Sequence, residues 1–495
     1  MNTYGSQLVA AYVICFLIFF GLLQPAGGSS TLLAQQQDNR NPLHFNIYQF
    51  TQYSPGNTPF WHHANRRGFI DPDASVSYLT GINLQIPVTP IGAGIGIGAG
   101  GELLNRFSDG PNTFHFPQLY LQAEYKALRL RAGRFYETMG KHIPGLSSGS
   151  MMLSPNATPF PKISLELSRF VDVPLTRGRV AFRGRYSEGI LENDRFTKSP
   201  RVHQKSIYLK FRIERLRVFS GIIHNAMWGG ESPQRGDLSG SFNDYLRIVF
   251  SQAASEESGM PGSGNRLGNS VGAYDFAATY TLDRIRFHAY RLFYLEDTPS
   301  TRFRSPWDGV WGAGFERPGG EKWINGLLYE FLHTITMDAK DHIPKGRANY
   351  YNHSVYQSGW SYYGNGLGNP LLTFDRDEGR FVNNMVIAHH IGLTGQPDER
   401  FRYRLLATYN RNYGQCDDRI SPGRCGAITT ENPMPDEWEL LPRSEFRRDR
   451  YSALLEGQIR VRQTPEINFH GSVAFDFGDY QARRAGVLAG FDILF

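Results

Sequence analysis

The sequence predicts an all-β protein, a single antiparallel transmembrane β-barrel of about 18 strands with long external loops. Three observations lead to this prediction. The last eleven residues alternate like a barrel strand, the first 34 read as an export signal, and 14% of the 495 residues are aromatic, beside 53 glycines. A barrel strand presents every second side chain to lipid, and aromatic residues collect where lipid meets water.

The final strand shows the pattern most clearly. One face carries apolar residues and the other small or polar ones: Ala485, Val487, Ala489, Phe491, Ile493 and Phe495 against Gly486, Gly490 and Asp492. Soluble sheets contain such strands too, but in a membrane the sheet must close, because lipid offers unpaired backbone groups no partner. We expect Phe495 to end in the periplasm and to be the contact for the barrel-assembly machinery.

The N-terminal segment is interpreted as a signal peptide. Val9 to Leu23 is an apolar run, and small polar residues follow it up to Ala34. The alternative is an uncleaved anchor, but the run is shorter than the roughly 20 residues that a spanning helix needs. We therefore expect residues 1–34 to be removed, and residues 35–495 to form one barrel domain in the cell outer membrane.

Charge and hydropathy narrow the class of partner. The mean hydropathy is −0.40, which a barrel can have because each strand needs only about 9 to 11 residues to cross the bilayer. The net charge of +6 is spread along the chain and not clustered. This argues against nucleic acid as a partner, and favours anionic partners such as lipopolysaccharide phosphate, outer-membrane lipids or acidic polysaccharide.

Short turns and long connections alternate along the chain. Tight turns are expected at Lys126-Ala127, Glu214-Arg215, Asp283-Arg284 and Gln463 to Pro465, on the periplasmic side. Five long connections rich in Gly, Pro, Trp and Tyr are expected outside: 137–162, 226–243, 296–322, 348–380 and 412–448.

The strand count contains one conflict. Three strands are expected between the turns at Glu214 and Asp283, whereas two turns on the same side of a membrane require an even number. Either Tyr245 to Ala253 is not a spanning strand, or a strand is missing in the glycine-rich stretch 254–272.

The glycine-rich and histidine-rich motifs are interpreted structurally. Gly92 to Gly101 resembles a dinucleotide loop, but no helical pattern follows it, so we predict a strand with Ile95 and Ile97 outward. His62-His63 and His389-His390 are neighbours, and neighbours on a strand point to opposite faces, so neither pair can chelate one metal from a strand. One histidine of the second pair is expected in the lumen. No metal or cofactor is predicted.

Two cysteines follow the signal segment, Cys416 and Cys425, in a polar stretch. In an exported protein such a close pair is expected to form a disulfide that pins a surface loop. The alternative is two free thiols.

The aromatic residues of the long connections are candidates for carbohydrate binding. Flat rings offer apolar surface to the C–H faces of sugars, and polar neighbours can hydrogen-bond the hydroxyls. The alternative is an aromatic girdle at the membrane interface, where Trp and Tyr also collect. The candidates are Trp307, Trp311, Trp323, Trp360, Tyr362 and Tyr363.

Four segments resemble a known family. Residues 146–166, 224–230, 242–247 and 356–370 are similar to the capsule assembly Wzi family, in the form of its Bacteroidota members. The resemblance implies an outer-membrane barrel of about eighteen strands that binds capsular or exopolysaccharide at the cell surface, with no reaction. Enteric members resemble a barrel preceded by a periplasmic helical bundle, whereas Leu43 to Phe50 here already alternates like a strand.

Three functions follow from these predictions. The first is a non-enzymatic barrel that binds surface polysaccharide and helps to anchor or assemble the capsule or exopolysaccharide layer. The second is a substrate-selective porin, in which charged lumen residues would line an open channel. The third is an outer-membrane enzyme acting on lipid or glycan, for which the sequence offers no convincing set of catalytic residues.

Overall fold

The computed structural model describes residues 43–110, 112–238, 240–252, 267–296, 301, 303–320, 322–337, 348–415 and 447–495. The predicted signal peptide, residues 1–34, lies outside the described residues. So do Cys416, Cys425 and most of the connection 412–448. The predictions for these segments therefore stay predictions.

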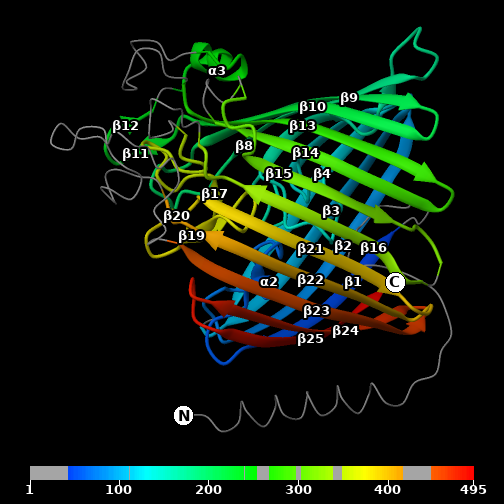
Figure 1. Ribbon diagram of the computed structural model, residues 1–495. Helices are drawn as coiled ribbons and strands as arrows, with labels where there is room; N and C mark the ends of the chain where they lie inside the picture. The colour runs from blue at the N-terminus through cyan, green and yellow to red at the C-terminus, as the bar shows by residue number, and fades with distance from the viewer. Residues whose placement is uncertain are drawn as a thin grey trace.

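Eighteen antiparallel strands close into one barrel (Figure 1). The sheet has nineteen strand segments, but β6 and β7 are parts of one interrupted strand, because both pair with β8. β1 pairs with β25 and so removes the free edges of the sheet. The barrel segments are β1 (His44–Tyr53), β2 (Val76–Gly92), β3 (Ile95–Ser108), β4 (Thr113–Tyr125), β5 (Leu128–Arg134), β6 (Lys162–Leu167), β7 (Val171–Asp172), β8 (Val180–Ile190), β9 (Arg201–Ile213), β10 (Leu216–Trp228), β13 (Asn269–Leu282), β14 (Ile285–Leu295), β15 (Gly309–Glu316), β16 (Lys322–His333), β21 (Val386–Gln396), β22 (Phe401–Asn412), β23 (Arg448–Gln463), β24 (Glu466–Gly478) and β25 (Arg484–Leu494).

The remaining elements are short and lie in the connections. They are α2 (Phe60–His63), α3 (Phe242–Val249), β11 (Glu231–Ser232), β12 (Gly236–Asp237), β17 (Ser361–Tyr362), β18 (Asn365–Gly366), β19 (Thr373–Asp375) and β20 (Arg380–Asn383). Neither described helix is both long and apolar enough to cross a bilayer.

The conflict in the strand count is resolved by α3. Residues 242–249, where a strand from Tyr245 to Ala253 was considered, form a helix, so only β10 and β13 span the barrel between the two turns. Ser241 caps this helix by accepting a hydrogen bond from the Asp244 amide at 3.2 Å. The first of the two explanations was therefore correct.

The predicted tight turns are confirmed and lie at one end of the barrel, the short-turn end. In three of them the first turn residue has a positive φ: Lys126 (57°), Glu214 (48°) and Asp283 (50°). Longer connections, including 54–75, 135–161 and 334–385, leave from the opposite end, the long-loop end. Chain direction places Phe495 at the short-turn end, where its amide donates to the Phe45 carbonyl at 2.9 Å.

Apolar and polar side chains alternate between the two faces of the wall. Ile95 and Ile97 are exposed on the outer face, as predicted, and the glycines that follow each of them, Gly96 and Gly98, are buried. His390 faces the lumen and His389 faces outward, which confirms the expectation for that pair. His62 and His63, in contrast, belong to helix α2 and not to a strand.

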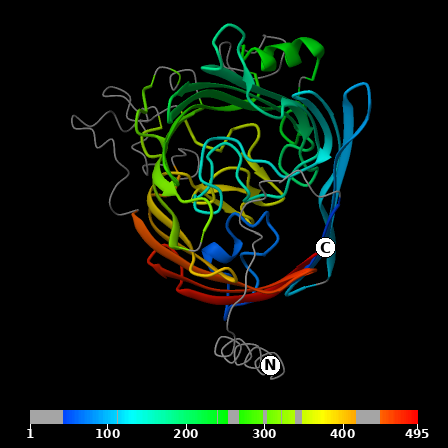
Figure 2. The ribbon, with the colours of Figure 1, turned by 90° about the vertical axis from the view of Figure 1, so that its right-hand side faces the viewer.

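The lumen is filled by the protein's own connections (Figure 2). Segments from 54–75, 135–161 and 348–385 run inside the ring of strands and supply most of a continuous apolar core. Met151, Met152 and Trp360 in these segments are completely buried. The connections 137–162 and 348–380 were expected to lie outside the barrel, and this expectation is wrong for their buried parts, because their apolar side chains pack in the lumen. The expected connection 296–322 is wrong as well, because it contains strand β15.

Aromatic rings on one strand repeatedly cover glycines on the next strand. Tyr48 lies opposite Gly81, Tyr120 opposite Gly100, and Tyr290 opposite Gly312. A Cβ added to Gly312 would lie 2.1 Å from Cζ of Tyr290. The Tyr290 hydroxyl holds the ring in this position by donating to Glu330 at 2.5 Å.

Replacement Gly312→Ala is expected to destabilise the barrel by about 2 kcal/mol, because overpacking displaces the Tyr290 ring from Glu330. The control is Gly184→Ala, where an added Cβ would meet its nearest atom, the Ser206 carbonyl oxygen, at 3.9 Å. The urea midpoint of unfolding in lipid vesicles measures both. Equal midpoints for the two variants would contradict the role of the tyrosine–glycine pairs.

Candidate functional site

Carboxylates on the inner wall hold the loops inside the barrel. Asp275 on β13 accepts the backbone amide of Lys141 at 2.7 Å. Glu330 on β16 accepts the amide of Ser148 at 2.6 Å, and Asp476 on β24 accepts that of Phe60 at 2.7 Å. Each bond gives a buried loop amide and a buried carboxylate a hydrogen-bond partner. Because the accepting carboxylate is charged, such a bond is stronger than one between neutral groups.

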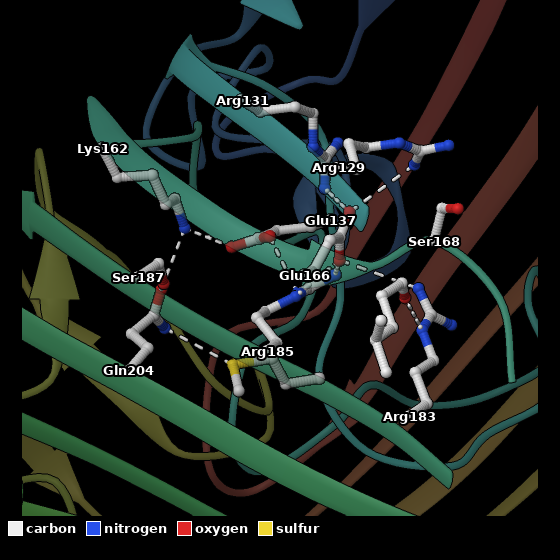
Figure 3. A network of polar contacts seen from close by, with 12 residues as sticks. Arg129, Arg131, Glu137, Lys162, Glu166, Ser168, Arg183, Arg185, Ser187 and Gln204 are labelled. Atoms are coloured by element: carbon white, nitrogen blue, oxygen red, sulfur yellow. Dashed lines mark hydrogen bonds and ion pairs between the residues drawn. The ribbon is translucent and has the colours of Figure 1, made fainter. Parts of the chain in front are cut away.

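A charged network clamps the two ends of the connection 135–161 (Figure 3). Glu137, just after β5, pairs with Lys162, the first residue of β6, and with Arg185 on β8 at 2.8 Å. Glu166 on β6 pairs with Arg131 and Arg185, both at 2.7 Å. The network thus joins the loop to strands β5, β6 and β8.

A cavity of about 250 Å³ lies beside this network. Its polar lining comes from both the wall and the inserted loop. Arg67 in this lining stacks on Tyr136, 3.6 Å from the ring centroid, and Arg131 Nε is buried without a hydrogen-bond partner among the described residues. The polar groups are Arg67, Gln85, Gln118, Arg131, Tyr136, Glu137, Thr138, Ser154, Thr158 and Lys162.

Two of the predicted aromatic residues are buried in the lumen. Trp360 Nε1 donates to the Met152 carbonyl at 2.9 Å, and the Tyr362 hydroxyl accepts a hydrogen bond from Arg134 at 3.3 Å. These two rings therefore hold the connection 348–385 against the loop 135–161 and the wall. They present no free face at the surface.

Tyr363 follows them and lies at the surface, with 53% of its area exposed. It occupies the turn of the hairpin β17–β18, where Tyr363 and Gly364 have φ values of 45° and 68°. Two positive φ values are typical of a type I′ turn, which favours Asn or Gly at the position that Tyr363 takes. A tyrosine kept there at a conformational cost is a candidate functional residue.

Buried charges hold this hairpin in place. Glu192 accepts the Tyr363 amide at 3.1 Å, and Arg195 donates to the carbonyls of Gly359 and Ser361 at 2.8 and 2.9 Å. Burial raises the pKa of Glu192 above its usual range, although Arg195 opposes the shift. Tyr363 is therefore presented on a rigid support and not on a loose loop.

Trp307 and Trp311 lie on the outer face near the long-loop end, with ring centroids 5.6 Å apart. Trp311 begins a row of residues that face one another across six neighbouring strands: Trp311, Phe331, His389, Tyr409, Tyr451 and Phe477. Such a row has the form of a membrane-interface girdle. Trp323 lies at the opposite, short-turn end, where its carbonyl accepts a hydrogen bond from Tyr403.

Several arginines near the cavity and the β17–β18 hairpin could not be recognised as site residues from the sequence. Arg106 donates to the Gly68 carbonyl at 3.0 Å, and Arg134 donates to the Tyr362 hydroxyl at 3.3 Å. No carboxylate among the described residues forms an ion pair with Arg67, Arg106 or Arg134. These cations come from three separate segments. Arg67 lines the cavity, Arg106 bonds the neighbouring Gly68, and Arg134 bonds Tyr362 of the β17–β18 hairpin.

The described residues contain no group of three or more His, Cys, Asp or Glu side chains that could hold a metal ion. Fold and interior together define a closed, eighteen-stranded transmembrane-type barrel whose lumen is filled by its own loops. A family model described as capsule assembly protein Wzi matches residues 51–384, more than half of the chain. The protein therefore belongs to the capsule assembly Wzi family.

The fold likeness rests on a solved structure with a TM-score above 0.5. Wzi of Escherichia coli, described as an outer membrane protein involved in group 1 capsule assembly and a carbohydrate-binding β-barrel, matches with a TM-score of 0.55 and 15% identity, over 92% of this chain and 85% of that chain. OccK3 and OccK7 of Pseudomonas aeruginosa match with TM-scores of 0.45 and 0.43 at 9% and 10% identity, over 92% of this chain and 95% and 98% of theirs. A search of curated protein sequences found no match.

Replacement Glu166→Gln is expected to destabilise the protein by about 3 kcal/mol, because it leaves the buried guanidinium groups of Arg131 and Arg185 without their shared carboxylate. The matched control is Glu378→Gln, which breaks an exposed pair with Arg380 and should cost about 0.5 kcal/mol. Unfolding midpoints in lipid vesicles measure both changes. Similar losses for the two variants would rule out a special role for the lumen network.

Proposed function

We propose that this protein is an outer-membrane barrel that binds surface polysaccharide at its long-loop end and helps to anchor or assemble the capsule or exopolysaccharide layer. Membership of the capsule assembly Wzi family is the observation that carries the proposal. The fold likeness to the carbohydrate-binding barrel Wzi of Escherichia coli supports it. We propose binding without catalysis.

The best-supported contact surface is the β17–β18 hairpin and its surroundings. Tyr363 offers an exposed ring on a rigid turn, and Arg106 and Arg134 lie nearby without paired carboxylates among the described residues. An aromatic face beside guanidinium groups suits a sugar that carries a carboxylate. We therefore propose an acidic polysaccharide as the ligand, with Tyr363 as the main ring contact.

The other aromatic candidates have different proposed roles. Trp360 and Tyr362 support the hairpin from inside, and Trp307 adds an exposed ring at the same end of the barrel. Trp311 and Trp323 lie on the outer face near opposite ends, where the membrane-interface alternative explains their positions.

A filled lumen favours this function over an open porin. The loops 135–161 and 348–385 pack into one apolar core within the ring of strands. A selective porin requires a continuous water-filled path, whereas a binding protein gains rigidity from a packed interior.

Further proposals concern export and assembly. Residues 1–34 would direct export, Cys416 and Cys425 would form a disulfide, and lipopolysaccharide would surround the barrel. The exposed ring of Phe495 would contact the barrel-assembly machinery during insertion. The resemblance to Bacteroidota members suggests that the bound polymer differs from that of enteric relatives.

Replacement Tyr363→Ala is expected to weaken polysaccharide binding about fivefold, because a stacked ring contributes about 1 kcal/mol. Tyr363→Asn should weaken binding equally while the protein stays at least as stable, since asparagine accepts a positive φ. Titration of purified protein with the surface polymer measures the affinity. The control is Tyr280→Ala, an exposed ring near the short-turn end. Unchanged affinity in both Tyr363 variants would refute the site.

Deletion of the gene is expected to release the surface polymer into the medium while the total amount synthesised stays normal. Anchoring predicts this result, because synthesis and export would not need the barrel. Loss of the polymer from both cells and medium would instead indicate a role in synthesis or export.

Low conductance is expected in planar bilayers for the complete protein. Replacing residues 140–158 by a short Gly-Ser linker, with Glu137 and Lys162 kept, should raise the conductance about tenfold or more by opening the lumen. A wild-type conductance as large as that of the variant would favour the porin function.

A further inference from the structure

Helix α3, in the described part of the connection between β10 and β13, does not lie in the lumen. This helix lies outside the ring of strands (Figure 2) and near the long-loop end of the barrel (Figure 1). The Tyr245 ring packs against Trp228 on β10, with centroids 5.5 Å apart, and the Tyr245 hydroxyl bonds that of Tyr186 on β8. Lys205 on β9 donates to the Val249 carbonyl at the end of the helix. Side chains from three strands therefore dock α3 on the outer wall.

The wall beneath α3 is polar, which is unusual for an outward-facing surface of a membrane barrel. His203 on β9 faces Glu188 on β8, with Nδ1 2.6 Å from Oε1, and the His203 ring is completely buried. His224 on β10 lies within hydrogen-bond distance of Ser251, 3.2 Å away, in the segment that follows the helix. Polar side chains exposed to acyl chains would destabilise a barrel, so the helix makes this part of the wall compatible with a membrane.

The apolar band of the barrel begins directly beside this polar patch. Ile207 and Ile222 face each other two residues nearer the short-turn end than Lys205 and His224, and each is 53% exposed. The same row continues through Tyr274 to Phe293, which joins the outer aromatic cluster with Trp311. The helix therefore lies at the level where lipid-facing residues give way to polar ones.

The outer face of the helix is apolar. Phe242, Leu246 and Phe250 follow one another at four-residue spacing, so they form one stripe along the side away from the barrel. Phe242 and Phe250 are 71% and 68% exposed, which is exceptional for phenylalanine in contact with water. Tyr245 and Ile248 occupy the opposite side, toward Trp228 and the wall.

We propose that α3 is an interfacial helix that inserts Phe242, Leu246 and Phe250 among the acyl chains at the outer-leaflet boundary. The continuity of this stripe with the exposed band at Ile207 and Ile222 favours lipid over a protein partner, because both surfaces meet one membrane boundary. The helix seals the polar patch and sets the depth of the barrel on this side. The inference rests on the proposed outer-membrane location, but not on polysaccharide binding.

Photocrosslinking in intact cells tests the proposal. Phe242 or Phe250 is replaced by p-benzoylphenylalanine, a close analogue at an exposed position, and the irradiated protein is purified and its mass adducts are identified. The positive control carries the same probe at Ile222, in the apolar band, and the negative control carries it at Tyr363, on the hairpin. Lipid adducts at Phe242 and Phe250 should match those at Ile222 and exceed those at Tyr363 by at least about fivefold.

Adducts of twice the protein mass, or adducts with another protein, in place of lipid would overturn the proposal and assign the stripe to a protein interface. Lipid yields no higher than at Tyr363 would also overturn it, provided that Ile222 gives lipid adducts. If Ile222 gave none, the outer-membrane location itself would be wrong. Failure of the proposed location and failure of the helix proposal are thus distinguished.

Discussion

Hydrogen bonds from loop backbone amides to carboxylates on the barrel wall are the interaction on which the rest of the structure depends. Asp275, Glu330 and Asp476 face the lumen on well-separated strands, and each accepts an amide from an inserted segment. An ionised carboxylate in a packed interior is costly without partners, and so is a buried amide. The wall carboxylates and the loop amides therefore satisfy each other's hydrogen-bonding needs. Without the inserted segments, the wall carboxylates would lose these partners.

The two faces of each strand consequently pack against different surroundings: the inner face against the inserted loops, and the outer face against lipid. Inside, charged pairs and a continuous apolar core lock the loops 135–161 and 348–385 in place. Outside, the wall must match lipid, and a row of aromatic residues from Trp311 to Phe477 lies near the long-loop end. Where the outer wall is polar, at His203 and His224, helix α3 covers it. The alternation of side chains along each strand allows both faces to match their surroundings at once.

A packed lumen also explains how the proposed contact surface can be rigid. The β17–β18 hairpin is supported from inside by Trp360 and by the buried pair Glu192 and Arg195, so its exposed Tyr363 is held in one orientation. Rigid presentation reduces the entropy lost when a flexible polymer binds. The same inserted segments thus fill the lumen and support the hairpin that carries Tyr363.

The fold class, the approximate strand number, the tight turns and the outward positions of Ile95 and Ile97 could be predicted from the sequence, because strand alternation and turn residues are local properties. The family resemblance was carried by segments of several kinds: 146–166 and 356–370 belong largely to inserted loops, 224–230 to the end of β10, and 242–247 to α3. Tertiary structure decided which aromatic residues are free: Trp360 is buried and Tyr363 is exposed although they lie three positions apart. It also decided that residues 242–249 form a helix outside the wall, and that Glu137 meets Arg185. Periodicity cannot show these contacts, since each depends on where a long connection packs after the barrel has closed.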